Sequence, residues 1–514
     1  MVMRKHLAVL LVLAVILFSS VVACAEGQYG GSLRIATTTS PPTLDTMANT
    51  HTATREIGMN IYETIVAFNG NYEVVPMLAE SWDISDDGLV YTFHLREGVP
   101  FHNGDIMEAE DVKASVERYI AVSPMNDNLE ILEEIKVLDK HTVQMTISRS
   151  SGAFLSNLAQ PKSLLGIMPK EVAEGAEARH VDIVGTGPYK LDEWIPDRHT
   201  KLSRFEDYVP FEGVPASGFA GKKVAYIDEL YYIPVPEAGS RVAGLETGEY
   251  DFADFLPGMD VPYLKEQEQL VVEDLMPYTW VVVYLNHSEG SIFNNKTLRQ
   301  AVQAGIDHEE IMIVSSDDSG RLDPGMYFNE QVWHSDAGAE FYNQNDPEKA
   351  KRLMEEAGYN GEEIVLLTNT DYDYMYKAGI VLERQLTELG FNVNMKVLDW
   401  PGQLDVRADL SQWDLSFSSH STRFDPVENN NYFFPSTTFF GYDNPQMADA
   451  LRRAADHTLV EDRYAAYEEA QAIFYEDVAM LKLYDLGIWQ GWQDHVKGYE
   501  PWYMLYFVNV WLDK

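Results

Sequence analysis

The sequence predicts an α/β protein with two differently organised halves. The first half, from Ser32 to about Asp105, has the residue pattern of strands and tight turns. The second half contains a helical segment between two strand-like segments, from Ile364 to Val397. The chain has 514 residues, and because a single hydrophobic core stops growing at about 250–300 residues, two or more packed units are expected.

The strand signal of the first half is clearest in "LVYTFHLREGVPF". Tyr91, Phe93 and Leu95 alternate with Val90, Thr92 and His94, which is the period of a strand with two different faces. A helix is predicted next, in "EAEDVKASVERYI". Val112, Val116, Tyr119 and Ile120 recur there at helical spacing.

The second half carries complete helix start and stop signals. In "DPEKAKRLMEEAGY", Asp346 is placed to cap a helix, Pro347 to occupy its first position and Gly358 to end it. "EIVLLT" follows as a buried strand, then a helix from about Tyr374 to Leu389 that ends at Gly390, then the strand "FNVNMKVLDW". A strand–helix–strand order of this kind predicts a parallel sheet.

The N-terminus has the three-part pattern of a secretion signal over residues 1–25. Arg4, Lys5 and His6 precede an apolar run, Leu7 to Phe18, which is followed by small residues. Cleavage after Ala25 would release a free chain. Alternatively, Cys24 would be acylated as the first residue of a lipoprotein. Both interpretations predict export to the periplasm, the second with the protein held on the outer face of the membrane.

Composition excludes several classes of partner. The chain has 81 acidic against 38 basic residues, a net charge of −43, whereas nucleic-acid binding needs a basic face. The same charge disfavours an anionic membrane surface. Because Cys24 is the only cysteine, no internal disulfide is expected, and stability must come from packing.

No catalytic or metal-binding motif is present. The sequence lacks a nucleophile elbow, H-E-x-x-H, a P-loop and C-x-x-C, and "DHEEIM" has no second histidine for a metal. No catalytic residue, metal or cofactor is therefore assigned. A binding protein is favoured, and an exported hydrolase acting on peptides or glycans remains the alternative.

Several segments together resemble one family. They include "GGSLRIATTTSPPTLDT", "IYETIVAFNGNYEVVPMLAESWDISDDGLVYTFHLREGVPFHNGD", "GTGPYKLDEW", "NNKTLRQAVQAGID" and "FFPSTTFFGYDNPQMADALRRA". Their order is similar to that of the extracytoplasmic solute-binding proteins of ABC importers, in the peptide/nickel-binding group of dipeptide and oligopeptide receptors.

The resemblance implies a bilobal periplasmic-binding-protein-like fold with mixed sheets and an extra N-terminal subdomain. Lobe I would span residues 26–287, in two subdomains completed by 485–514, and lobe II would span 288–484. The hinge would lie near "VVVYLNHS" and "AMLKLYDLG". Closure of the lobes would bury the solute and present a closed shape to the membrane permease. The protein would act as a monomer.

The resemblance also places the main ligand contact. In peptide-binding members an aspartate after the strand matching Trp413–Phe417 captures the free amine of the peptide. Here Arg423 occupies or adjoins that position, and Asp425 would serve if the loop shifts. A guanidinium repels an ammonium and grips a carboxylate or phosphate. The alternative is that Arg423 pairs with neighbouring acids on the surface.

Further contacts are expected from aromatic and hydroxyl side chains. Trp280 and Trp400 match places where family members cover the ligand, with core packing as the alternative for both. The hydroxyls of Thr38, Thr39 and Ser40 either face the cleft or support a turn. His420 is either a pH-sensitive contact or a loop hydrogen bonder, and Trp413 is assigned to the core. The sequence leaves the solute open among a peptide, an opine-like conjugate, an oligosaccharide and a metal chelate.

Overall fold

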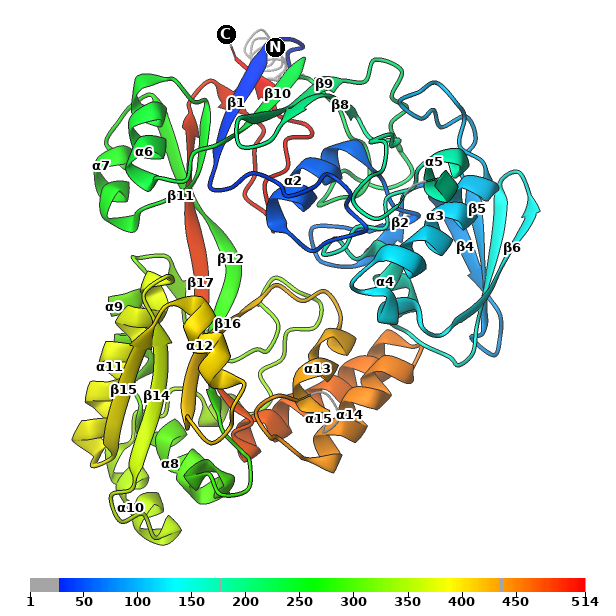
Figure 1. Cartoon of the computed structure of the whole chain (residues 1–514). Coiled ribbons are helices and arrows are strands. Elements are labelled where there is room, and N and C mark those ends of the chain that lie inside the picture. The colour runs from blue at the N-terminus through cyan, green and yellow to red at the C-terminus, as the bar shows by residue number, and fades with distance from the viewer. Residues whose placement is uncertain (1–26, 176, 435–437, 514) are drawn as a thin grey trace, which may run out of the picture.

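The computed structural model describes residues 27–175, 177–434 and 438–513. The predicted signal peptide, residues 1–25 with Cys24, lies outside these ranges. Figure 1 shows two bodies of similar size joined by a pair of long strands, with the N-terminal half of the chain in one body and most of the C-terminal half in the other.

One mixed sheet of eleven strands passes through both bodies, in the order β15-β14-β16-β12-β17-β11-β1-β10-β9-β8, with β13 paired to β17. The strands of the first body are β1 (Ser32–Thr37), β8 (Tyr189–Ile195), β9 (His199–Arg204), β10 (Glu229–Pro234) and β11 (Phe252–Leu256). Those of the second are β13 (Gly320–Arg321), β14 (Glu363–Asn369), β15 (Asn392–Leu398) and β16 (Leu415–Ser421).

The two bodies share β12 (Leu270–Leu285) and β17 (Met480–Gln493), which pair antiparallel along most of their length. The later half of β12 also pairs with β16, and the later half of β17 pairs with β11. The register of β12 against β17 shifts between Leu275 and Thr279. This irregular point lies just before the first predicted chain crossing, Val281–Ser288, and opposite the end of the second, Ala479–Gly487. The predicted lobe boundaries stay a prediction.

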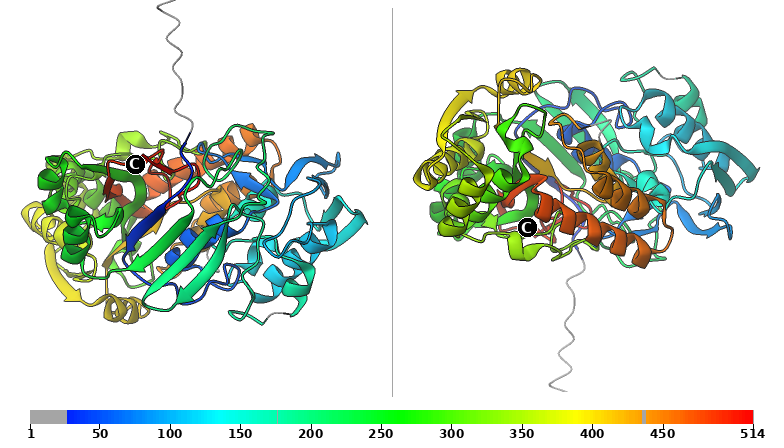
Figure 2. Two further views of the ribbon diagram at one scale, coloured as in Figure 1. Left: turned by 90° about the horizontal axis from the view of Figure 1, so that it is seen from above. Right: turned by 90° about the horizontal axis from the view of Figure 1, so that it is seen from below.

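The first body contains a second, antiparallel sheet, in the order β4-β5-β7-β6, away from the strand pair (Figure 2). Tyr91, Phe93 and Leu95 of β5 are buried, as the alternation predicted. The elements of this region are β2 (Val66–Phe68), β3 (Val74–Pro76), β4 (Ala79–Ile84), β5 (Val90–Leu95), β6 (Leu132–Asp139), β7 (Thr142–Ile147), α3 (Ala109–Val122), α4 (Phe154–Ala159) and α5 (Lys170–Gly175).

The remaining elements of the first body are α2 (Thr52–Ile61), α6 (Ala238–Thr247), α7 (Val261–Lys265), β18 (Val496–Lys497) and β19 (Trp511–Leu512). The helices of the second body are α8 (Lys296–Gly305), α9 (His308–Ser315), α10 (Pro347–Ala357), α11 (Asp373–Leu389), α12 (Trp400–Arg407), α13 (Asn430–Phe433), α14 (Pro445–Asp456) and α15 (Val460–Asp477). Short 3₁₀ turns cover Asn126–Leu129, Gly258–Asp260, Ile292–Asn294, Ala339–Phe341 and Pro426–Asn429.

The predicted capping signals and strand–helix–strand unit are confirmed. The Asp346 carboxylate accepts the Lys349 N–H at 2.8 Å, and Gly358 ends α10 with φ of 74°. Such a left-handed conformation is one that glycine adopts without steric cost. Strands β14 and β15 pair in parallel on either side of α11 in sequence, and α11 ends at Gly390.

Three local predictions were wrong in detail. The strand expected at Trp413–Phe417 is β16, Leu415–Ser421, because its ladder with β12 continues to the pair Thr279–Ser421. Trp400 begins α12 behind the capping Asp399 instead of ending a strand. Ile120, expected on the buried face of α3, is 37% exposed.

Each body has its own hydrophobic core. Among the buried members of the large core of the first body, Phe424 is the only one from residues 288–484. Within the described ranges, no helix is long and apolar enough to cross a bilayer. No group of three or more potential metal-ligating side chains occurs there either.

Candidate functional site

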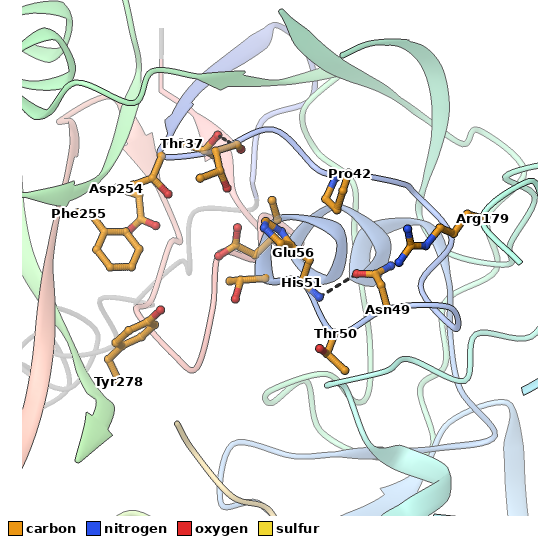
Figure 3. A pocket seen from close by; sticks show the side chains of 14 residues that line it. Thr37, Pro42, Asn49, Thr50, His51, Glu56, Arg179, Asp254, Phe255 and Tyr278 are labelled. Carbon is orange, nitrogen blue, oxygen red and sulfur yellow. Dashed lines mark hydrogen bonds between the residues drawn. The ribbon is translucent and has the colours of Figure 1, made fainter. Parts of the chain in front are cut away.

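A cavity of about 550 Å³ opens in the first body beside the strand pair. It is lined by the end of β1, the start of α2, the end of β11 and Tyr278 of β12 (Figure 3). Thr37, Thr38 and Thr39 supply one wall, so the structure places two of the three predicted hydroxyl residues at a cavity. The third, Ser40, lines a smaller adjoining cavity and accepts a hydrogen bond from the Asp197 N–H at 3.0 Å.

Two carboxylates, Glu56 and Asp254, lie on this cavity and are 7% and 3% exposed. Burial, followed by the charge of Asp254, holds the pKa of Glu56 well above its usual range. Burial also raises the pKa of Asp254 to about 6, although Gln490 donates a hydrogen bond to it at 3.0 Å. A neighbouring buried carboxylate disfavours the charged form of an acid, as burial itself does.

A bulge in β11 aims Asp254 and Phe255 at the cavity. The register of β11 against β17 shifts between Ala253 and Leu256, and Phe255 has φ of 50°. A positive φ is uncommon for a bulky residue and persists only where the surroundings enforce it. Arg241 enforces it here, because its guanidinium donates to the carbonyls of Asp254 and Phe255, each at 2.8 Å.

Arg423 lies on the loop that follows β16 and is 8% exposed. Its Nη2 donates to the Tyr432 hydroxyl at 2.8 Å, and its Nη1 is 3.8 Å from Glu428 Oε2. The guanidinium also lies 5.2 Å from the centre of the Tyr432 ring. Its Nε, although buried, has no hydrogen-bond partner. The surface ion pair considered as an alternative is therefore only a loose contact with Glu428, in a buried setting.

The residue after Arg423 locates this loop between the two bodies. The ring of Phe424 packs against three aromatic rings of the first body: Phe68 at 4.5 Å, Tyr503 at 4.8 Å and Tyr72 at 5.2 Å. Arg423 therefore lies where the second body contacts the first.

Further cationic side chains approach Arg423 from both bodies. The pKa of Lys162, in the first body, is lowered to about 8, first by burial, then by the charge of Arg423 and least by that of Arg55, while Glu428 acts in the opposite direction. Within the described part of the chain the Lys162 ammonium makes no ion pair. Arg407 of α12 has a buried Nη1 without a partner and lies 4.8 Å from the Phe439 ring.

His420 lies among these cations and is 1% exposed. Burial, and then the charges of Arg423, Lys162 and Arg407, hold its pKa well below the usual range. Its Nε2 is 2.7 Å from the Tyr284 hydroxyl, and its ring stacks on Tyr432 at 4.3 Å. His420 thus lies in β16 rather than in a loop, and its hydrogen bond is with Tyr284, while a contact with the ligand stays a prediction.

The carboxylate of Asp425 forms an ion pair with another side chain of the protein. Its Oδ1 is 2.6 Å from Nη2 of Arg463, and both side chains are almost fully buried. Arg463 in turn donates to the Gly152 carbonyl of the first body at 2.9 Å. The other oxygen of Asp425, Oδ2, is buried and has no hydrogen-bond partner among the described residues, and a role for Asp425 in binding stays a prediction.

The predicted tryptophans occupy different settings. Trp280 is 2% exposed and meets His420 edge-on at 4.4 Å. Trp413 is buried, as assigned. Trp400 is half-buried and lies edge-on to Tyr372 at 5.2 Å, with the Arg407 guanidinium 5.7 Å from its ring. Trp400 thus adjoins the cationic group, whereas Trp280 belongs to the core behind it.

Sequence reasoning missed Glu56, Asp254, Lys162, Arg55 and Arg407. A signal for Asp254 was present, because it is the only polar residue in the strand "FADFL". An acid inside an otherwise apolar strand needs a partner or a function. Lys162, Arg55 and Arg407 gave no comparable signal, since chain segments far apart in the sequence bring them together.

The structure thus combines two bodies joined by paired strands, a cavity in the first body and a group of buried charges where the bodies meet. The chain matches the family model for bacterial extracellular solute-binding proteins, family 5, over residues 73–442. It belongs to this family. It is the substrate-binding component of an ABC transporter, and family members bind transported solutes rather than convert them.

Named relatives agree with this assignment. A probable peptide ABC transporter periplasmic-binding protein, y4tO of Sinorhizobium fredii, is 28% identical over 391 residues, which cover 73% of each chain. The glutathione-binding protein GsiB of Pectobacterium atrosepticum is 26% identical over 448 residues, which cover 83% of each. The solved structure of DppA from Helicobacter pylori with the peptide STSA is 26% identical, has a TM-score of 0.74 and matches 95% of this chain and 99% of that one. These relatives give no support to the hydrolase alternative.

Proposed function

We propose that this receptor captures a peptide-like or modified amino-acid solute through an anionic group of that solute, with Arg423 as its main contact. The supporting observation is the meeting of Arg423 with Lys162, Arg407 and Arg55 where the two bodies touch. Among the charged groups that shift the pKa of Lys162, Glu428 is the acid. The whole chain, by contrast, has 81 acidic and 38 basic residues.

This arrangement suits a carboxylate or phosphate. A lysine whose pKa is lowered by burial and by other cations gains stability when an anion arrives, because the anion offsets both effects. A guanidinium with an unpaired buried Nε has a hydrogen-bond donor to offer. Because the cations come from both bodies, an anion between them favours the closed arrangement over an open one.

The captured solute is then passed to a membrane transporter. The exported chain delivers its closed, loaded form to ABC permease subunits in the membrane, as a monomer in the periplasm or held by lipid at Cys24. Cleft closure requires no covalent chemistry and no cofactor. Small peptides are consistent with the peptide-binding and glutathione-binding relatives, and the basic junction adds the requirement for a free anionic group.

The test compares peptides that differ in one charge. Mature protein is titrated by calorimetry with di- to tetrapeptides that have a free carboxylate and with the same peptides amidated at the C-terminus. The free forms are expected to bind at least about 10-fold more tightly. Arg423→Ala should abolish most of that preference, since a charge-assisted hydrogen bond contributes about 1.5–3 kcal/mol. Arg352→Ala, which removes an exposed arginine of α10, is the matched control.

Two results would overturn the proposal. One is equal affinity of wild-type protein for free and amidated peptides, and the other is an unchanged preference in Arg423→Ala. Mass spectrometry of the recovered peptides completes the test, because turnover would restore the hydrolase alternative.

A further inference from the structure

We propose that the cavity beside the strand pair binds an organic cation, a primary ammonium or guanidinium, between the carboxylates of Glu56 and Asp254 and the rings of Phe255 and Tyr278. Figure 3 shows Asp254, Phe255 and Tyr278 on one side of the cavity and Glu56 facing them. The cavity belongs to the first body, whereas Arg423 belongs to the second. A solute that used both sites would carry a cationic and an anionic group.

The Glu56 carboxylate is the first observation that points to a ligand. It lines the cavity, is 93% buried, and receives no side-chain hydrogen bond or ion pair from the described residues. A main-chain hydrogen bond from Leu505 lowers the pKa of Glu56 by less than burial raises it. A buried carboxylate with spare acceptor sites is costly unless a cation or a proton satisfies it.

The second observation is the partner carboxylate. Asp254 accepts from Gln490 at 3.0 Å, and Gln490 is itself held by the Tyr499 hydroxyl at 2.9 Å. This chain of hydrogen bonds fixes the orientation of the Asp254 carboxyl. Two fixed carboxylates on one cavity can each accept hydrogen bonds from an ammonium or from the two arms of a guanidinium.

The aromatic rings favour an organic cation over a metal ion. Phe255 and Tyr278 lie edge-to-face at 5.4 Å and 89°, and both line the cavity. Ring faces attract ammonium and guanidinium groups. Calcium would need six to eight oxygen ligands, and the described residues contain no cluster of three or more ligating side chains.

The strained bulge in β11 positions Asp254 and Phe255 at the cavity. The positive φ of Phe255 turns Asp254 and Phe255 to the cavity, and Arg241 holds this conformation through hydrogen bonds to main-chain carbonyls. Such strain is retained where the surrounding structure compensates for it, and it is common at binding sites.

Several charged groups face the pair and set its response to pH. Arg55 and Arg241 act on it as cations, and the phenols of Tyr232, Tyr278, Tyr499 and Tyr503 lie around it. The cavity also holds His51 and Arg179. The Arg55 guanidinium donates to the Tyr503 hydroxyl and to Thr52, each at 2.8 Å.

This cation site is relevant to transport only if the proposed receptor function holds, but its test uses probes that lack an anionic group. Ligand-observed saturation-transfer NMR on mature protein compares n-butylammonium and n-butylguanidinium with n-butanol, which has the same alkyl chain and no charge. The two cations are expected to bind in the millimolar range, and n-butanol at least 10-fold more weakly. Their affinity should fall from pH 8 to pH 5, because protons compete for the pair.

Matched variants separate this site from the anion site. Glu56→Gln and Asp254→Asn should each weaken n-butylammonium binding at least 10-fold. Glu249→Gln removes an exposed acid of the same body and should leave binding unchanged. Arg423→Ala should also leave it unchanged. Equal binding of free and amidated peptides by wild-type protein, together with intact butylammonium binding, would therefore count against the proposed function alone.

The inference is overturned if n-butylammonium and n-butanol bind equally. It is also overturned if both carboxyl variants bind the cation as wild type does, or if Ca²⁺ or Mg²⁺ displaces the probe at equimolar concentration. Thermal melting of each variant confirms that the chain is folded, and two separate carboxyl variants are available if one fails to fold.

Discussion

Neighbouring parts of this chain contain two kinds of buried charge pair, one of opposite charges and one of two carboxylates. Asp425 and Arg463 form a close pair at 2.6 Å with both side chains almost fully buried, so each charge is compensated. Among the residues that the structure describes, no such cation lies within 4 Å of Glu56 or Asp254, and burial raises the pKa of both. The first pair contributes to structure, whereas the second leaves an unsatisfied charge for a solute or a proton.

Breaking the compensated pair should destabilise the protein. Arg463→Met leaves Asp425 buried and unpaired, and it also removes the donor to the Gly152 carbonyl. The expected loss is about 3–5 kcal/mol of unfolding free energy, measured by urea denaturation. The double variant Asp425→Asn with Arg463→Met should recover part of that loss. If Arg463→Met were as stable as wild type, the pair would not be a structural one.

Removing one charge of the uncompensated pair should instead stabilise the unliganded protein at neutral pH. An Asp254 carboxyl with a folded pKa of about 6 and an unfolded value of about 3.9 binds more protons when folded. Stability therefore falls as pH rises through this interval. Asp254→Asn is expected to exceed wild type by on the order of 2–3 kcal/mol at pH 7.5.

At pH 4 the advantage of Asp254→Asn over wild type should largely vanish, because the wild-type carboxyl is then protonated in the folded state. Paired urea denaturation curves at the two pH values measure this difference. The expectation fails if the variant is less stable than wild type at pH 7.5, or if its advantage is larger at pH 4.

At the scale of single elements, the bulge of β11 is the feature on which the cation site depends. Arg241 of α6 is 4% exposed and donates to four main-chain carbonyls: Val235 at 2.7 Å, Asp254 and Phe255 at 2.8 Å, and Pro236 at 2.9 Å. One side chain thus joins the loop before α6 to the strained end of β11.

Arg241→Lys should weaken both stability and the cation site. An ammonium lacks the planar fork and cannot reach all four carbonyls, so buried acceptors are left without donors. The expected cost is about 2–4 kcal/mol in unfolding free energy, with weaker n-butylammonium binding in the same variant. Arg198→Lys, at the turn between β8 and β9, provides a control for the substitution itself. Unchanged stability would show that the bulge holds its conformation without Arg241.

Element-scale features were also the ones most readily predicted from the sequence. Helix α10 and the unit from β14 to β15 depend on local signals, the cap at Asp346 and the glycines at Gly358 and Gly390, and these were confirmed. The extension of β16 to Ser421 was missed, because pairing with β12 overrides the polar composition of that segment. Strand preference depends on neighbours that a local window does not contain.

The candidate site was predicted only in part for the same reason. Arg423 was found through its position on a recognisable loop, and Thr38 and Thr39 through the end of β1. Lys162 and Arg407 join Arg423 by tertiary contacts between segments distant in sequence. No local pattern marks such residues, and an excess of acids elsewhere in the chain hides a small basic group.

At the scale of the whole molecule, Phe424 is the main apolar contact made by the second body inside the core of the first. Phe424→Ala should therefore favour an open arrangement of the unliganded protein, since deletion of a buried phenylalanine costs about 3–5 kcal/mol. Small-angle scattering is expected to show a larger radius of gyration for this variant than for wild type.

Phe391→Ala is the matched control, because Phe391 is 2% exposed and packs within the core of the second body. It should lower the melting temperature without changing the radius of gyration. If Phe424→Ala scatters as wild type does while Phe391→Ala expands, the aromatic contact does not hold the two bodies together.

The continuous sheet also constrains the order in which the chain can be assembled during synthesis and export. Strand β11 is completed by β17, and β17 is the last long strand to leave the ribosome. Until β17 has been synthesised, β11 lacks this neighbouring strand. Contacts between segments so far apart in the sequence form slowly. The chain can therefore complete this sheet, and with it the connection between the two bodies, only after the residues of β17 have been synthesised.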